Sequence, residues 1–178
     1  DILIRDHTGK PALPHKYLVH SGDSKDCIDL AILAEGYKES EMDTFLKDAE
    51  AATEALFSYE PFKSHRQHFN VVAVFSASEE SGVAVPREMR WPRTAFSSHF
   101  DTFYSDRYLT TRQVKAINNA LIGIPHEHLI ILANSDVYGG GGVYNSYLLS
   151  STHHKWYLPV VVHEFGHSFG GLTDEYFH

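Results

Sequence analysis

Two histidines and a glutamate near the C-terminal end of the sequence have the types and spacing of a metal site with its own base. Residues 163–167 read H-E-F-G-H, an H-E-x-x-H pattern. On a helix, residues i and i+4 lie one above the other, so His163 and His167 can offer ring nitrogens to one Zn²⁺ ion. Glu164 projects about 100° from His163, where its carboxylate can reach a metal-bound water rather than the metal. The pattern therefore predicts hydrolysis with Glu164 as the catalytic base.

The residues that flank this pattern favour a metal site over its plainest alternative, a pair of hydrogen-bonded core histidines. Pro159 suits the first turn of a helix, where its missing N–H has no cost, and three valines at 160–162 give that helix an apolar body. After the second histidine, Gly170 and Gly171 can end the helix and reverse the chain.

A third metal ligand is expected after this glycine turn. In metzincin-type zinc peptidases, a glycine turn brings the third ligand to the metal three residues later. Counting three from Gly171 gives Asp174, whose carboxylate can bind zinc, whereas counting from the preceding glycine gives a threonine, a poor zinc ligand. We therefore expect one Zn²⁺ per chain, held by the two histidines and Asp174, with Glu175 as the alternative third ligand.

The segment VVVHEFGHSFGGLTDEY at 160–176 resembles the active-site signature of the bacterial IgA peptidase family of zinc metallopeptidases. Three upstream stretches also resemble this family: IDLAILAEGYKESEM at 28–42, YEPFKSHRQHFNVVAVFSASEESGV at 59–83 and NSDVYGGGGVYNSY at 134–147. The resemblance spans about residues 27–176. It implies a secreted or cell-surface zinc endopeptidase that acts on protein or peptide substrates, with His163 and His167 as ligands and Glu164 as the catalytic residue. Cleavage of immunoglobulin does not follow from it.

Composition excludes several other kinds of partner. The chain has 15 Lys and Arg against 23 Asp and Glu, a net charge of −8, and no run of basic residues, which argues against nucleic acid and anionic membrane surfaces. No apolar stretch approaches the length of a membrane span, so membrane insertion is not expected.

The alternative function is a non-catalytic cell-surface module that retains a zincin fold and binds protein or glycan. Glu164 disfavours that alternative, and the sequence carries no signal for an oligomeric state.

Strands and helices are expected to alternate along the chain. Apolar runs predict strands at 28–34, 69–75 and 129–133, and a further edge strand at 143–149. Helices are expected from Ser40, with Asp43 as its capping-box partner, from Thr110, and from near Pro159. This order predicts an α/β fold. With the family resemblance, the expected class is zincin-like: a mixed, mostly parallel sheet with helices packed on it and the active-site helix below the edge strand.

The 178 residues fit one domain. Residues 1–26 are polar and lack periodicity, so we expect an extended lead-in, followed by a zincin-like catalytic domain at 27–178 that is truncated at its C-terminal end. Residues 76–106 form a long loop, which predicts either a functional loop, such as a lid or binding loop, or a mobile one. Trp91 is expected to be a packed anchor of this loop. The glycine run at 139–142 has two interpretations of equal weight, an edge strand that pairs with extended substrate or a flexible hairpin turn.

The remaining histidines give weaker signals. His126 and His128 would share one face of a strand, where we favour solvent-exposed strand entry over a second metal site. His153 and His154 are adjacent and are expected in a loop. Cys27, the one cysteine, excludes an intramolecular disulfide and is expected to be a buried, inert thiol.

Overall fold

A six-stranded sheet forms the centre of the computed structural model, which describes residues 10–101, 108–137, 139–143 and 147–170. Its strands are β1 (His15–His20), β2 (Ile28–Glu35), β3 (Phe69–Val74), β4 (His128–Ala133), β5 (Gly140–Val143) and β6 (Tyr147–Ser151). They lie in the order β1-β3-β2-β4-β6-β5. The inner pairs β2–β3, β2–β4 and β4–β6 are parallel, whereas the edge strands β1 and β5 are antiparallel to their neighbours. The prediction of an α/β fold with a mixed, mostly parallel sheet is confirmed.

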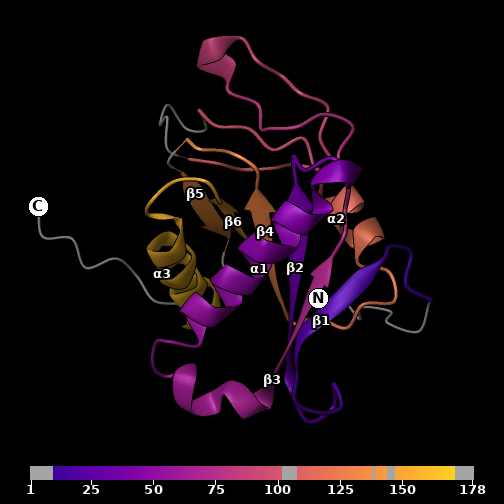
Figure 1. Ribbon diagram of the computed structural model, residues 1–178, viewed down its shortest axis with the longest axis vertical. Helices are drawn as coiled ribbons and strands as arrows, with labels where there is room; N and C mark the ends of the chain where they lie inside the picture. The colour runs from indigo at the N-terminus through magenta and orange to yellow at the C-terminus, as the bar shows by residue number, and fades with distance from the viewer. Residues whose placement is uncertain (1–9, 102–107, 138, 144–146, 171–178) are drawn as a thin grey trace, which may run out of the picture.

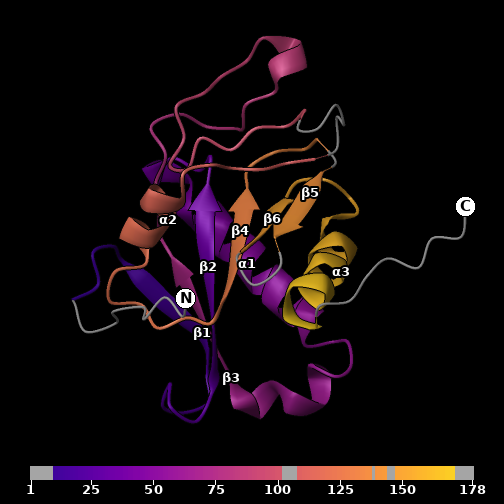
Figure 2. The same ribbon diagram turned by 180° about the vertical axis from the view of Figure 1, so that it is seen from behind.

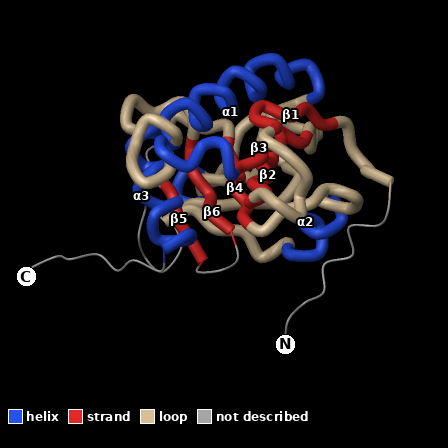
Figure 3. The backbone as a smooth tube through the Cα atoms, turned by 90° about the horizontal axis from the view of Figure 1, so that it is seen from below, coloured by secondary structure: helices blue, strands red, loops and turns tan. Residues whose placement is uncertain are grey.

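Helices cover both faces of this sheet (Figures 1, 2 and 3). Helices α1 (Met42–Leu56) and α3 (Tyr157–Gly170) bury their apolar sides against one face, and α2 (Val114–Ala120) packs with the long loop on the other. Three short 3-10 turns complete the described elements: η1 (Glu39–Glu41), η2 (Lys63–His68) and η3 (Pro86–Glu88). Because side chains alternate along each strand, every central strand contributes to both apolar clusters.

Aromatic side chains fix the rotation of α3 on the sheet. Phe165 is only 1% exposed, lies edge-on to Phe62 with ring centroids 5.1 Å apart, and stacks on Phe169 at 5.5 Å. Since Phe165 must face the core, His163, two residues earlier, lies on the outer side of the helix, where it is exposed. The packing of one phenylalanine thus determines which face of α3 is available for chemistry.

Three expected element boundaries differ from the structure. Helix α1 does not use Ser40 as its cap, because η1 precedes it and the Glu41 carboxylate instead accepts the Lys38 backbone N–H at 2.8 Å. Helix α2 begins four residues after Thr110, since that residue pairs with His99 in an antiparallel bridge. The lead-in expected over residues 1–26 contains β1, an exposed edge strand that lacks the apolar alternation by which a strand is recognised.

The expected edge strand at 143–149 is two strands, with β5 at the sheet edge and β6 inside it. The edge strand is therefore built mostly from the glycine run, which has no side chains to produce an apolar pattern. Of its two interpretations, the extended strand is the one that the structure shows.

The long loop is attached to the carboxyl end of β2. The carboxylate of Glu35, which is completely buried, accepts the backbone N–H groups of Phe96 at 3.3 Å and Ser98 at 2.9 Å. Gly36 has a φ of +73°, and a Cβ there would lie 2.2 Å from the carbonyl oxygen of Gly82. The end of β2 therefore requires both a buried carboxylate and a glycine to hold the loop.

The tip of the same loop projects from the sheet in Figure 1. Trp91 is 61% exposed and Met89 is 79% exposed. The expectation that Trp91 is a packed anchor is therefore wrong, because the buried carboxylate described above and the apolar residues of the loop base hold the loop instead.

Substituting Glu35→Ala tests this attachment. We expect the free energy of unfolding to fall by about 2 kcal/mol or more, because two buried N–H groups lose their acceptor and each such loss costs about 1–3 kcal/mol. Urea unfolding followed by circular dichroism measures the change. The exposed Glu39 provides the control, since Glu39→Ala should stay within about 0.5 kcal/mol of the parent. Equal effects of the two substitutions would contradict the role of Glu35.

Candidate metal and catalytic site

The side chains of His163 and His167 meet on the outer face of α3. Their Nε2 atoms are 3.0 Å apart, and their rings lie edge to face with centroids separated by 4.5 Å. Two nitrogens that bind one tetrahedral zinc at 2.0–2.1 Å are about 3.3 Å apart, so this pair fits a shared metal ion with a shift of a few tenths of an ångström. The predicted i, i+4 placement is thus present, and the two Nε2 atoms lie within hydrogen-bond distance of each other.

The third expected ligand, Asp174, and its alternative Glu175 both lie outside the described residues. Among residues that the structure does describe, no three His, Cys, Asp or Glu side chains come together as a metal-binding group. The described part of the candidate metal site therefore consists of His163 and His167.

Glu164 lies on α3 directly beside the edge strand β5. A Cβ built on Gly140 would lie 3.2 Å from Cγ1 of Val160 and 4.0 Å from Cγ of Glu164. The first distance is shorter than ordinary van der Waals contact, so a larger residue at position 140 would require the Val160 side chain to shift by a few tenths of an ångström. Gly140 therefore allows β5 to pass close to the aliphatic part of the Glu164 side chain, and Glu164, the expected base, is half-buried.

The outer edge of β5 carries backbone groups that can pair with another extended chain. In an antiparallel pair, alternate residues direct their N–H and C=O groups to the neighbouring strand and away from it. Gly139 faces β6, since its carbonyl accepts the Ser151 N–H at 3.1 Å, whereas the Gly140 carbonyl accepts the Leu109 N–H at 3.4 Å on the outer side. By the same alternation, Gly142 directs its N–H and C=O outward.

His126 precedes β4, and His128 is the first residue of that strand. His126 is buried, with Nδ1 2.9 Å from the carbonyl oxygen of Ile124, and His128 is half-buried with its ring centroid 5.0 Å from that of Phe169. The prediction of solvent-exposed strand entry is therefore wrong for both, and for His128 the cause is the packing of Phe165 and Phe169 of α3 on the start of β4. Cys27 is half-buried rather than buried.

His153 and His154 lie in the connection between β6 and α3, as predicted for loop residues. His153 contacts Asp48 of α1, with its Nε2 2.8 Å from Oδ2 of that carboxylate. The Asp48 carboxylate also accepts a hydrogen bond from the Tyr37 hydroxyl. Burial, with a contribution from the Asp48 charge, raises the pKa of Tyr157 to about 12, and the same two causes raise the pKa of Tyr37 well above its ordinary value.

A family model matches residues 17–178, which include the last four residues of β1, the three described α-helices and the histidine pair. The chain belongs to the IgA Peptidase M64 family. M64 peptidases are metallopeptidases in general, so membership assigns the chain to the hydrolases that act on proteins. No curated protein matches the chain. Within the described residues, no helix is both long and apolar enough to cross a bilayer.

Sequence reasoning overlooked Asp48, although the sequence contains a signal for it. Asp48 lies three residues after Phe45 and four before Ala52, both of which are buried. A carboxylate at this spacing falls on the apolar side of α1, where a charged side chain requires a partner. Its partners could not be named from the sequence, since His153 lies more than 100 residues away in the chain.

The raised pKa of Tyr157 leads to a testable pH dependence. In the folded chain this phenol keeps its proton up to about pH 12, whereas in the unfolded chain it loses the proton near pH 10. Above pH 10 the unfolded state therefore binds fewer protons, and the free energy of unfolding falls as pH rises through 12. We expect Tyr157→Phe to have a shallower fall in this window, measured by urea unfolding between pH 8 and 12. Tyr59→Phe, at a 53% exposed phenol, should keep the parent slope, and matching slopes in all three proteins would refute the assignment.

Proposed function

We propose that this M64 chain is a zinc-dependent endopeptidase with a zincin-like active site on α3. The observation that carries this proposal is the 3.0 Å approach of the His163 and His167 Nε2 atoms on a helix whose Glu164 lies against the edge strand of the sheet. The two histidines would hold one zinc ion with Asp174 as the third ligand, or Glu175 in its place. A secreted or cell-surface location follows from the family resemblance of the sequence and belongs to the same proposal.

A zinc ion in this site would supply Lewis acidity, which acidifies water and polarises a peptide carbonyl. The chain's own contribution to the reaction is proton transfer and alignment. Glu164 takes a proton from water as the water oxygen attacks the carbonyl carbon, and it passes that proton to the amine as the C–N bond breaks. The two histidines would transfer no proton in these steps, because their Nε2 atoms would be occupied as zinc ligands.

The edge strand β5 is the proposed binding surface for the peptide substrate. An extended peptide can add to a sheet edge through main-chain hydrogen bonds, and Gly142 directs such groups outward. The Gly140 carbonyl is already bonded to Leu109, so pairing at that end of the strand is restricted. Because main-chain groups are common to all peptides, this surface suits protein or peptide substrates as a class and does not select immunoglobulin.

Metal analysis tests the ligand set. We expect about one zinc per chain. His163→Ala and Asp174→Ala should each lower zinc affinity by more than about 100-fold, because the loss of a residue that only hydrogen-bonds to a ligand already lowers affinity by up to about 100-fold. Competition with a chelator measures the affinity. His15→Ala, on the opposite edge of the sheet, should bind zinc like the parent.

If Glu175→Ala loses zinc while Asp174→Ala keeps it, the third ligand is Glu175. If the parent neither contains nor takes up zinc, the proposed metal site is wrong.

Replacing Glu164 with Gln tests the base. Glutamine keeps the size of the side chain but cannot accept the water proton, so turnover should fall by about 10²–10⁴-fold while zinc content stays the same. Hydrolysis of a peptide library by zinc-loaded protein measures turnover. Near-normal cleavage by Glu164→Gln would show that another group accepts the proton. A zinc-bound parent that cleaves no peptide in the library would instead support the non-catalytic binding module.

A further inference from the structure

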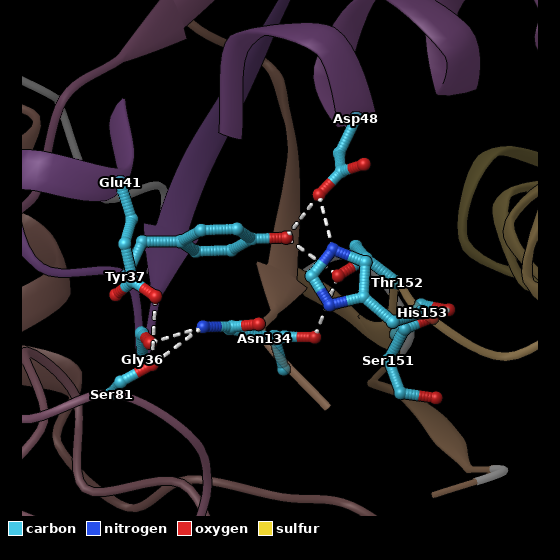
Figure 4. A network of polar contacts seen from close by, with 11 residues as sticks. Gly36, Tyr37, Glu41, Asp48, Ser81, Asn134, Ser151, Thr152 and His153 are labelled. Carbon is cyan, nitrogen blue, oxygen red and sulfur yellow. Dashed lines mark hydrogen bonds and ion pairs between the residues drawn. The ribbon is translucent and has the colours of Figure 1, made fainter. Parts of the chain in front are cut away.

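Asp48 is the meeting point of side chains from separate parts of the chain (Figure 4). Its Oδ2 atom accepts the Tyr37 hydroxyl at 2.7 Å and lies 2.8 Å from Nε2 of His153. The Asp48 side chain is 14% exposed and the His153 side chain 35% exposed, so this contact is shielded from bulk water on the Asp48 side. In Figure 4, the phenol and the imidazole both point at the same carboxylate.

The partners of Asp48 join the carboxyl ends of three parallel strands. Tyr37 follows β2 and is completely buried, and its hydroxyl also contacts the Thr152 hydroxyl. Thr152 donates to the Ala133 carbonyl of β4 at 3.0 Å, and the His153 N–H donates to the Ser135 carbonyl at 2.9 Å. The network therefore fixes the segment that leaves β6 relative to both the sheet and α1.

The same segment leads directly into α3. Tyr157 is the first residue of α3, and its N–H donates to the His154 carbonyl at 3.0 Å. Asp48 of α1 thus holds the residues that enter α3 from one side, while Phe165 holds the middle of the helix from the core.

Helix α3 packs closely against β5 near its first turn. Val160 lies in the first turn of α3 and approaches the Gly140 backbone so closely that an added Cβ would be 3.2 Å from it. A tilt of the first turns of α3 would therefore change the separation between β5 and Glu164. Apolar packing alone permits small sliding movements, whereas two donors aimed at one carboxylate oxygen specify a single arrangement.

We propose that Asp48 and His153 act as a positioning pair, which sets the orientation of the first turns of α3 against β5 and so aligns Glu164 with a peptide on that strand. Neither residue lies at the histidine pair, and both act through α3. The expected effect of the pair on turnover rests on the proposed endopeptidase function. The expected effect of the pair on the order of α3 does not depend on that function.

Four variants of the full chain test the pair. His153→Leu removes the contact, Asp48→Asn weakens it, and His153→Gln retains an N–H donor at the place of Nε2. Glu50→Gln removes an exposed carboxylate from the same helix and serves as the control. For each zinc-loaded variant, kcat, KM and zinc affinity are measured on a library-selected peptide, and amide hydrogen exchange is measured over residues 157–162.

We expect His153→Leu and Asp48→Asn to lower kcat by about 10–100-fold, the range for misaligned reacting groups, with KM and zinc affinity within about threefold of the parent. Both ligating histidines move together on one helix, so zinc binding should persist. Amide exchange at residues 157–162 should be faster in these two variants than in the parent. His153→Gln should keep a kcat close to that of the parent, and Glu50→Gln should match the parent.

The double variant Asp48→Asn/His153→Leu should have a kcat no lower than that of the slower single variant, since both substitutions remove the same contact.

Unchanged kcat and exchange in His153→Leu would overturn the proposal, as would a loss in His153→Gln equal to that in His153→Leu. A fall in zinc affinity that accounts for the whole loss of turnover would also overturn it, because the pair would then support the metal site rather than the alignment. If the parent cleaves no peptide, the endopeptidase function fails, and the exchange measurement alone decides whether the pair orders α3.

Discussion

The close passage of β5 against the first turns of α3 is the constraint on which the candidate site depends. A Cβ at position 140 would lie 3.2 Å from Cγ1 of Val160 and 3.3 Å from the carbonyl oxygen of Leu149, so a larger residue there would require these neighbours to shift by a few tenths of an ångström. This contact brings the edge of the sheet to Glu164, and it determines that a peptide added to that edge would pass over the helix that carries the histidine pair. Gly140 therefore takes part in a close contact with α3 as well as in the proposed binding surface.

Two kinds of interaction maintain this contact. The aromatic group of Phe62, Phe165 and Phe169 provides the apolar burial that holds α3 on the sheet. The hydrophobic effect is non-directional, so apolar burial stabilises the packed helix without specifying its exact tilt on the sheet. The Asp48 network is directional, and it acts at the end of the helix nearest Gly140. Stability and orientation thus come from different residues.

Sequence patterns were sufficient where the relevant contacts are local. The i, i+4 spacing of His163 and His167 predicts their convergence, and the apolar runs predict β2, β3 and β4 to within one residue at each end. The patterns failed where partners distant in the chain decide the outcome. The strand β1 is exposed along most of its length, β5 is mostly glycine, and His128 is covered by α3, which approaches from the other end of the sequence.

This division between local and distant contacts also separates two properties of the site. The approach of His163 and His167 to each other depends on one turn of one helix, so it tolerates changes elsewhere as long as α3 forms. The position of Glu164 against β5 depends on other segments, because Gly140 lies beside α3 and Asp48 contacts the residues that lead into the helix. In the proposed peptidase, substitutions in those segments would change the alignment of Glu164 with a peptide while the histidine pair stays in place. Within one family, changes in substrate preference are expected at such distant contacts rather than in the H-E-x-x-H segment itself.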